Sequence, residues 1–504
     1  MKTERKSGIL LHPTSLPGQF GIGELGSAAY RFIDFLEKSE QQLWQICPLG
    51  PTGFGDSPYQ CFSAVAGNPY LISIERLKKE ALIKDEDLIG APNFSPEKID
   101  YGRVIPFKLN LLKKAYERWQ IAASEEEKNN FNKFIKENKD WLYDFSLFMA
   151  IKDEQNGASW NKWPQDLALR KKNALSEAEE RLADCIQKHA FYQYVFFKQW
   201  NLLKNYANQK GISIIGDIPI FVAYDSCDVW ANRKDFYLDK NGIPTVVAGV
   251  PPDYFSATGQ RWGNPLYRWS EMKKKEYSWW SARFKNILKL VDIVRLDHFR
   301  GFAAYWEISA EEETAINGKW VKGPGMDLFR ALKKNLGKLP IIAEDLGVIT
   351  PDVEKLLEES GFPGMRVLQF AFDGKPDNIY LPYNHPTNSI VYTATHDNDT
   401  CEGWFKSITE EERQCYRRYT AYINCSVHWQ MMRLAMSSVS NTCIVPLQDV
   451  MGLDSEARMN FPGRAGGNWC WRFNEQRLDE GLSKALADIT KTYGRGTIVI
   501  SEKV

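Results

Sequence analysis

At residues 293–300 the chain reads Ile-Val-Arg-Leu-Asp-His-Phe-Arg, an apolar run that ends among charged side chains. This pattern predicts a short buried strand with Asp297 just past its last apolar residue. Arg295, His298 and Arg300 flank Asp297, and such cations should lower the pKa of its carboxyl group and keep it ionised. An ionised carboxylate at a strand end can serve as a nucleophile. A salt-bridged aspartate that caps a loop is the alternative.

The rest of the chain repeats a unit made of a short apolar strand, a polar or Gly/Pro-rich loop and an amphipathic helix. The predicted strands are 9–12, 43–49, 212–215, 293–297, 339–343, 365–372, 390–393 and 442–447. Helices predicted between them include 27–40, 191–209, 274–290, 326–336, 352–360 and 410–436. Eight such units predict an α/β fold in which a parallel sheet closes into a (β/α)₈ TIM barrel. The sequence has no GxxxxGK[ST] motif, which disfavours a P-loop nucleotide-binding sheet.

Two segments interrupt the alternation within what we expect to be a single catalytic barrel unit, residues 1–504. Residues 75–190 are rich in Lys, Glu and helical periodicity, which predicts a mostly helical insertion subdomain after the second strand. Residues 223–270 are dense in Trp, Tyr, Asp, Gly and Pro. This composition predicts a loop-rich, aromatic subdomain over the active site, after the third strand. We expect no C-terminal β-sandwich domain, because little chain follows residue 490.

Composition argues against several classes of partner. Lys plus Arg and Asp plus Glu both number 64, so the formal net charge is zero and nucleic acid is not an expected partner. No apolar run approaches the about 18 residues of a membrane span, and none near the N-terminus is long enough for a signal peptide. The 9 cysteines include no CxxC pair, which is typical of free thiols in a reducing compartment. We therefore expect a cytoplasmic protein, and we expect it to be a monomer or a weak homo-oligomer.

Aromatic residues are unusually frequent, with 17 Trp and 22 Tyr, and many stand beside Gly, Pro, Asn or Asp. Aromatic side chains in such loops more often line a binding surface than a core. Sugar rings present lines of C–H groups that pack on flat rings. The composition therefore favours a carbohydrate site, with a protein–protein contact as the alternative.

Three acidic residues follow predicted strands: Asp297, Glu344 and Asp397. In TIM barrels the loops after the strands meet in one pocket, where catalysis occurs. Arg295 lies two residues before Asp297, so both side chains point to the same side of the strand. Glu344 follows an apolar run, and burial should raise its pKa. One ionised and one protonated carboxyl group in a pocket is typical of a retaining glycosidase.

Other uses of these residues are weaker alternatives. Any single acid at a strand end could simply cap a helix or pair with an arginine. A metal site would draw on His12, His298, His396, Asp297 and Glu344. The chain has no HExxH or similarly close ligand spacing, so we expect no metal and no cofactor. A Ser-His-Asp triad lacks the GxSxG motif, and Ser57 lies in a Gly-Asp-Ser-Pro turn.

Longer motifs narrow the interpretation. Three of them surround the acids: Arg295-Leu-Asp-His-Phe-Arg-Gly, Ala343-Glu-Asp-Leu-Gly and Thr395-His-Asp-Asn-Asp. Others are Leu11-His-Pro-Thr-Ser-Leu-Pro-Gly, Gly55-Asp-Ser-Pro-Tyr-Gln, Gly216-Asp-Ile-Pro-Ile-Phe-Val, Val250-Pro-Pro-Asp-Tyr-Phe-Ser-Ala-Thr-Gly-Gln-Arg-Trp-Gly-Asn-Pro and Gly467-Asn-Trp. The first set resembles the α-amylase clan. Together, in order from about residue 8 to residue 473, they resemble glycoside hydrolase family 77, the 4-α-glucanotransferases, amylomaltases or disproportionating enzymes.

This resemblance implies transfer, with retention, of an α-1,4-glucan segment to the 4-hydroxyl of another glucan or of glucose. The partners would be maltooligosaccharides, starch or glycogen chains. Asp297 would be the nucleophile, Glu344 the general acid/base and Asp397 the transition-state stabiliser. The residues implied to bind substrate are Tyr59, Ser57, Asp217, Tyr254, Phe255, Trp262, Arg295, His298, Asp373, His396 and Asn468. An α-amylase-like glucan hydrolase with the same acids is the main alternative, and a non-catalytic glucan-binding protein is another.

Overall fold

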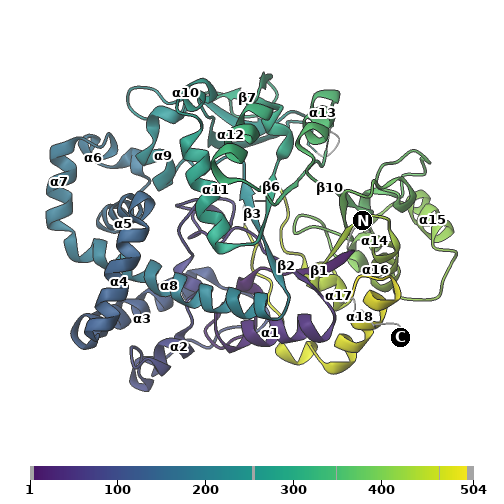
Figure 1. The fold of residues 1–504 in the computed structure, drawn as a ribbon, viewed down its shortest axis with the longest axis horizontal. Coiled ribbons are helices and arrows are strands. Elements are labelled where there is room, and N and C mark those ends of the chain that lie inside the picture. Colours follow the sequence, from purple (N-terminus) through teal and green to yellow (C-terminus); the bar gives the residue numbers. More distant parts are fainter. Residues whose placement is uncertain (1–4, 253–255, 348, 465, 497–504) are drawn as a thin grey trace.

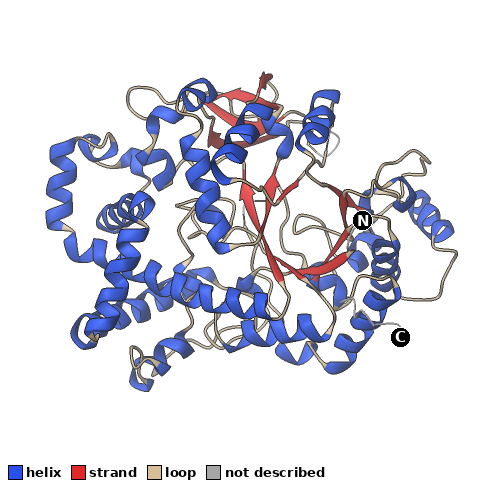
Figure 2. Ribbon diagram, viewed as in Figure 1, coloured by secondary structure: helices blue, strands red, loops and turns tan. Residues whose placement is uncertain are grey.

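The computed structural model describes residues 5–252, 256–347, 349–464 and 466–496, and its centre is a ring of eight parallel strands (Figures 1 and 2). Their spatial order is β10-β11-β12-β1-β2-β3-β6-β9. Their bounds are β1 (Lys6–Leu10), β2 (Leu43–Gln45), β3 (Ser213–Pro219), β6 (Ile293–Asp297), β9 (Ile341–Ala343), β10 (Gly364–Val367), β11 (Ser389–Tyr392) and β12 (Thr442–Pro446). The Ala343 N–H donates to the Pro363 carbonyl at 2.9 Å, between the two ends of this sheet. The strands therefore form a nearly closed barrel, and the predicted TIM barrel is confirmed.

Alternate residues of each strand serve two different cores, because successive side chains point to opposite faces. One set fills the barrel with large apolar groups: Leu10, Leu43, Ile215, Ile342, Met365, Val367, Ile390, Tyr392 and Ile444. The other set, which includes Ile9, Trp44 and Val294, packs outward against the helices. The barrel is thus solid, and only the ends of its strands are open to a ligand.

Helices surround the barrel (Figure 1). They are α1 (Ser27–Lys38), α8 (Ala183–Gln209), α10 (Trp269–Lys274), α11 (Ser278–Leu290), α12 (Met326–Leu336), α13 (Pro351–Ser360), α14 (Cys401–Ser407), α15 (Glu410–Tyr419), α16 (Val427–Ser437), α17 (Leu447–Val450) and α18 (Glu480–Thr492). The prediction of one helix over 410–436 is wrong. Ala421 and Tyr422 adopt left-handed backbone conformations, with φ of 54° and 52°, which turn the chain and divide the amphipathic pattern between α15 and α16.

Most of residues 75–190 form a group of helices beside the barrel, on the left in Figure 1. They are α2 (Ile74–Lys79), α3 (Tyr101–Ala122), α4 (Glu125–Glu137), α5 (Lys139–Glu154), α6 (Gln165–Ala168) and α7 (Lys172–Arg181). Aromatic rings join them to α8. The ring of Trp119 lies 4.9 Å from Phe131 and 5.1 Å from Phe191, measured between centroids. The long helix α8 thus links this helical group to the barrel.

A second, antiparallel sheet lies at one side of the barrel, at the top in Figure 2. Its order is β5-β4-β7-β8, with bounds β4 (Val246–Val250), β5 (Gln260–Pro265), β7 (Ala304–Ser309) and β8 (Gly318–Lys322). The segment 223–270, predicted as loop-rich, therefore contributes two strands and the short helix α9 (Cys227–Ala231). The sequence prediction missed β7 and β8. Within the described ranges, no helix is long and apolar enough to cross a membrane.

Candidate active site

A buried arginine connects two carboxylates at the ends of neighbouring strands. Asp297 is the last residue of β6, and Arg295 lies opposite Asp217 of β3 in the register of the sheet. The Nη1 atom of Arg295 lies 2.9 Å from Asp297 Oδ1 and 2.5 Å from Asp217 Oδ2. The arginine side chain is 3% exposed. The predicted approach of Arg295 to Asp297 is therefore present, and the arginine also holds a second carboxylate.

From Asp217 the contacts continue across the barrel opening. The Tyr59 hydroxyl donates to Asp217 Oδ2 at 2.9 Å. Its ring stacks on the imidazole of His396, with centroids 5.1 Å apart, and Trp469 lies 5.7 Å from both rings. His396 Nε2 in turn lies 3.4 Å from Asp397 Oδ2. Residues of β3 and β6 and of the segments after β2, β11 and β12 thus converge on one site.

Backbone N–H groups hold the carboxyl group of Glu344, which directly follows β9. His298 donates to Oε2 at 2.6 Å and Leu346 donates to Oε1 at 2.8 Å. His298 has a left-handed backbone, with φ of 53°, a conformation that costs a non-glycine residue about 1–3 kcal/mol. This strained residue follows Asp297 directly. The turn after β6 therefore brings Glu344 close to Asp297.

The acids Asp297 and Glu344 both have raised pKa values. Burial raises the pKa of Asp297 to about 6, although Arg295 opposes the shift. Burial raises the pKa of Glu344 to about 7, and the Asp297 carboxylate adds to the rise. The expected lowering at Asp297 is wrong, because loss of water outweighs the arginine. Asp297 is 29% exposed and touches Arg295, so it ionises first and Glu344 keeps its proton near neutral pH.

Asp397 has the opposite electrostatic environment. Burial by itself would raise its pKa, but the imidazolium of His396 and the amide of Asn460 hold the pKa well below its usual range. Asn460 Nδ2 donates to Asp397 Oδ1 at 2.6 Å. Arg458 donates to the Asp397 carbonyl at 2.7 Å and to the Asn460 carbonyl at 2.8 Å. Sequence reasoning missed Asn460 and Arg458, since no local pattern relates them to a residue some sixty positions earlier.

Comparisons with known proteins identify the family of this chain. The family model described as 4-alpha-glucanotransferase, of glycoside hydrolase family 77, matches residues 11–478. The chain belongs to the 4-alpha-glucanotransferase family. It is 50% identical to the 4-alpha-glucanotransferase of Synechocystis sp. over 499 residues, which cover 98% of this chain and 99% of the relative. It is also 50% identical to that of Thermus thermophilus over 502 residues, with 97% and 100% covered.

Solved structures in this family have the same fold. The amylomaltase from Streptococcus agalactiae, solved in complex with acarbose, has a TM-score of 0.95 and 41% identity, and the match covers 98% of this chain and 100% of that one. The amylomaltase from Corynebacterium glutamicum has a TM-score of 0.76 at 18% identity, with 97% and 74% covered, which supports the fold alone. The predicted family membership is confirmed, and the chain is an enzyme of the 4-alpha-glucanotransferase family.

Other predicted site residues of this family member are near the acids. Trp262 of β5 meets the ring of His298 edge to face, with centroids 4.9 Å apart. Its Nε1 atom donates to Gln260 Oε1 at 3.2 Å. Ser57 Oγ accepts the backbone N–H of Tyr59 at 3.2 Å. Trp262 therefore extends the site from the antiparallel sheet, and Ser57 supports the loop that carries Tyr59.

Four predicted residues are not brought into these contacts. Asn468 bonds only within its own loop, where it accepts from the Phe461 N–H at 3.0 Å and donates to the Arg464 carbonyl at 2.9 Å, among the described residues. Asp373 is exposed and accepts from the Lys375 N–H at 3.1 Å. The strand β10 ends at Val367, not Phe372 as predicted, so Asp373 lies beyond the barrel rim. The remaining two residues, Tyr254 and Phe255, lie outside the described residues.

A small pocket is lined by His396 and by Asn398 and Asp399, which lie on either side of Asp397 in the chain. The ends of β1, β11 and β12 line it, and His12 forms part of its wall. Burial lowers the pKa of His12 to about 3, and His396 adds to this effect. His12 is therefore neutral at physiological pH. Within the part of the chain that the structure describes, the one cluster with metal-ligand geometry lies elsewhere, in the helical group.

Proposed function

We propose that this enzyme is a retaining transglycosylase that transfers an α-1,4-glucan segment to the 4-hydroxyl of another glucan or of glucose. The observation that supports this proposal is the pair of neighbouring carboxyl groups that share one proton near neutral pH. Asp297 ionises first beside Arg295, and Glu344 has a pKa of about 7. A double-displacement mechanism needs one ionised and one protonated carboxyl group.

In the first step, an oxygen of Asp297 attacks C1 of the donor glucose unit. The C1–O4 bond breaks, and the proton of Glu344 moves to the departing O4, so the reducing-end part of the donor leaves as an alcohol. The product is a glycosyl ester on Asp297. The Arg295 guanidinium, 2.9 Å from Asp297 Oδ1, keeps the attacking carboxylate ionised.

In the second step, the acceptor 4-hydroxyl replaces the leaving group. The Glu344 carboxylate removes its proton, the acceptor oxygen attacks C1 and the ester bond to Asp297 breaks. Asp297 becomes a carboxylate again and Glu344 is protonated again, so the enzyme returns to its starting state. Two inversions at C1 give net retention.

The remaining polar groups bind and stabilise the sugar. Asp397 stays ionised beside His396, which suits a carboxylate that stabilises the positive charge of an oxocarbenium-like transition state. Asp217 Oδ1 and both ring nitrogens of His298 are buried without a hydrogen-bond partner among the described residues. Unpaired polar atoms of this kind favour hydrogen bonds to a bound ligand, and sugar hydroxyls would supply them.

Transfer rather than hydrolysis requires that an acceptor sugar, and not water, reaches the glycosyl ester. Trp262 packs against His298, which follows the proposed nucleophile directly. We propose that residues 223–270 act as a subdomain that covers the acceptor side, where flat apolar rings favour a sugar over water. The helical group within 75–190 acts as a separate insertion subdomain beside the barrel.

Incubation with maltotriose distinguishes the transferase from an α-amylase-like hydrolase. A transferase produces glucose together with chains longer than three units, whereas a hydrolase produces only shorter sugars. We expect the longer chains with the wild-type enzyme and none with Asp297→Asn. Shorter products alone from the wild-type enzyme would refute the transfer activity.

A further inference from the structure

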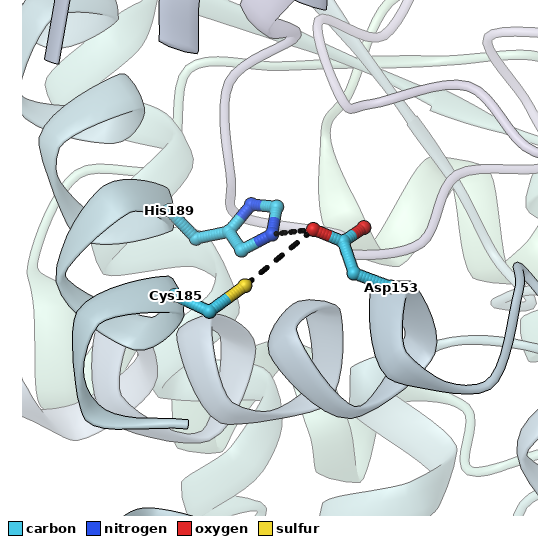
Figure 3. A group of neighbouring side chains, drawn as sticks. All are labelled: Asp153, Cys185 and His189. Atoms are coloured by element: carbon cyan, nitrogen blue, oxygen red, sulfur yellow. Dashed lines mark hydrogen bonds and ion pairs between the residues drawn. The ribbon is translucent and has the colours of Figure 1, made fainter. Parts of the chain in front are cut away.

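Asp153, Cys185 and His189 form a cluster where the end of α5 meets the start of α8 (Figure 3). Asp153 is the penultimate residue of α5. Cys185 and His189 lie four positions apart on α8, so they share one face of the helix. The cluster shares no residue with the carbohydrate site and belongs to the helical group beside the barrel.

The ligand atoms of these side chains are close enough to bind one ion. His189 Nε2 lies 2.9 Å from Asp153 Oδ2, and Cys185 Sγ lies 3.5 Å from the same oxygen (Figure 3). All three atoms lie within 4.8 Å of one another. A tetrahedral zinc ion with bonds of about 2.0–2.3 Å needs ligand atoms roughly 3.3–3.8 Å apart. Small side-chain rotations would therefore satisfy the coordination distances.

The types of ligand select the class of ion. A thiolate and an imidazole favour Zn²⁺ and similar ions over Mg²⁺ or Ca²⁺, which prefer oxygen ligands. The His189 side chain is 8% exposed, while that of Asp153 is 44% exposed. The imidazole is thus held by its surroundings, and the carboxylate side remains open to solvent. A water molecule from that side would complete a tetrahedral set.

A lysine occupies the same carboxylate. Lys188 Nζ lies 3.1 Å from Asp153 Oδ2, so the cluster has a competing cation attached to one of its three ligands. A bound divalent ion would displace the ammonium group, which is 21% exposed and can turn to water. The lysine therefore weakens ion binding without blocking the site.

We propose that Asp153 Oδ2, Cys185 Sγ and His189 Nε2 form a binding site for a Zn²⁺-class ion that joins α5 to α8. On binding, the Cys185 thiol releases its proton to solvent and the Lys188 ammonium leaves Asp153. The ion lies outside the glucan site and takes no part in sugar transfer. It adds a cross-link between two helices that are otherwise joined by side-chain packing and by the polar contacts of Asp153.

Co²⁺ titration of the full-length, reduced enzyme tests the site, because a cobalt–thiolate bond absorbs in the near ultraviolet and tetrahedral Co²⁺ absorbs in the visible range. We expect one equivalent of Co²⁺ to bind and Zn²⁺ to displace it. The thiolate band should disappear in Cys185→Ser and weaken in His189→Gln. It should be unchanged in Cys425→Ser, which removes an exposed cysteine outside the cluster.

Lys188→Met provides an independent test, because it distinguishes a metal site from a cluster that serves only as an ion pair. Removal of the competing ammonium should tighten Co²⁺ binding, whereas loss of a simple salt bridge would leave binding unaffected. Circular dichroism of each metal-free variant checks that it is folded. The proposal is overturned if the wild-type enzyme gives no thiolate band, if the band survives in Cys185→Ser, or if Lys188→Met binds no more tightly.

Discussion

The substitution Arg295→Gln removes the cation that Asp297 and Asp217 share. The Nη1 atom of Arg295 lies 2.9 Å from one carboxylate and 2.5 Å from the other, and its side chain is 3% exposed. Glutamine keeps much of the shape and can donate a hydrogen bond, but it carries no charge. Because Arg295 lowers the pKa values of both Asp297 and Glu344, its removal should raise both.

The size of the effect follows from the contact. An adjacent arginine lowers the pKa of an aspartate by about 1–3 units, so a change of ~2 units takes Asp297 from about 6 to ~8. At pH 7 the ionised fraction of Asp297 then falls from about 0.9 to about 0.1, a loss of roughly tenfold. Glu344 shifts in the same direction, so the bell-shaped pH profile of kcat/KM moves to higher pH by ~1–2 units.

The assay measures initial rates of maltotriose disproportionation from about pH 5 to about pH 9. Arg366→Gln is the matched control, since Arg366 Nη1 lies 2.9 Å from Asp345 Oδ2 and both side chains are largely buried. Both variants should lose up to about 3–5 kcal/mol of unfolding free energy, because each leaves a carboxylate unpaired. The profile should shift only in Arg295→Gln. If it stays at the wild-type position in that variant, Arg295 does not control the ionisation of Asp297.

Three further changes test other parts of the site. In wild type, burial raises the Asp297 pKa from 3.8 to about 6, so stability is lost as pH rises through 6. Asp297→Asn should therefore unfold at the same temperature as wild type near pH 4. Above pH 7 its free energy of unfolding should exceed that of wild type by up to about 3 kcal/mol. A lower free energy of unfolding above pH 7 would contradict the raised pKa of Asp297. Asn460→Ala removes the 2.6 Å hydrogen bond to Asp397 and should lower kcat by roughly 10- to 100-fold with little change in KM. Steady-state kinetics that show a raised KM and an unchanged kcat would exclude a positioning role for Asn460. Trp262→Ala should lower the ratio of long chains to free hydrolysis products from maltotriose, and an unchanged ratio would remove Trp262 from acceptor selection.

Local sequence was enough to predict a strand and the contacts between residues that are neighbours in the chain. The strand run that ends at Asp297 and the two-residue spacing to Arg295 fixed both the barrel element and the ion pair between them. The pKa of Asp297 was predicted in the wrong direction because its burial depends on side chains from distant loops. Only the folded chain shows that loss of water there outweighs one arginine.

Residues far apart in the sequence account for the other differences. Asn460 reaches Asp397 from 63 positions away, and no periodicity relates the two. The family resemblance implied that Asp373 binds substrate, at the end of a strand predicted to reach Phe372. In the structure β10 ends at Val367 and a short helical turn, Leu368–Phe370, follows it. Among the described residues, β7 pairs with β4 and β8, and β8 pairs with β7, so their pattern became clear only in the fold.

The proposed glycosyl ester on Asp297 can be observed directly. Glu344→Gln lacks the base needed for the second step, while α-maltosyl fluoride needs no acid to leave in the first, so the intermediate should accumulate. After brief incubation and peptic digestion, mass spectrometry should find one maltosyl group on the peptide that contains Asp297. Release of fluoride without an adduct, or an adduct on Asp397, would contradict covalent catalysis by Asp297.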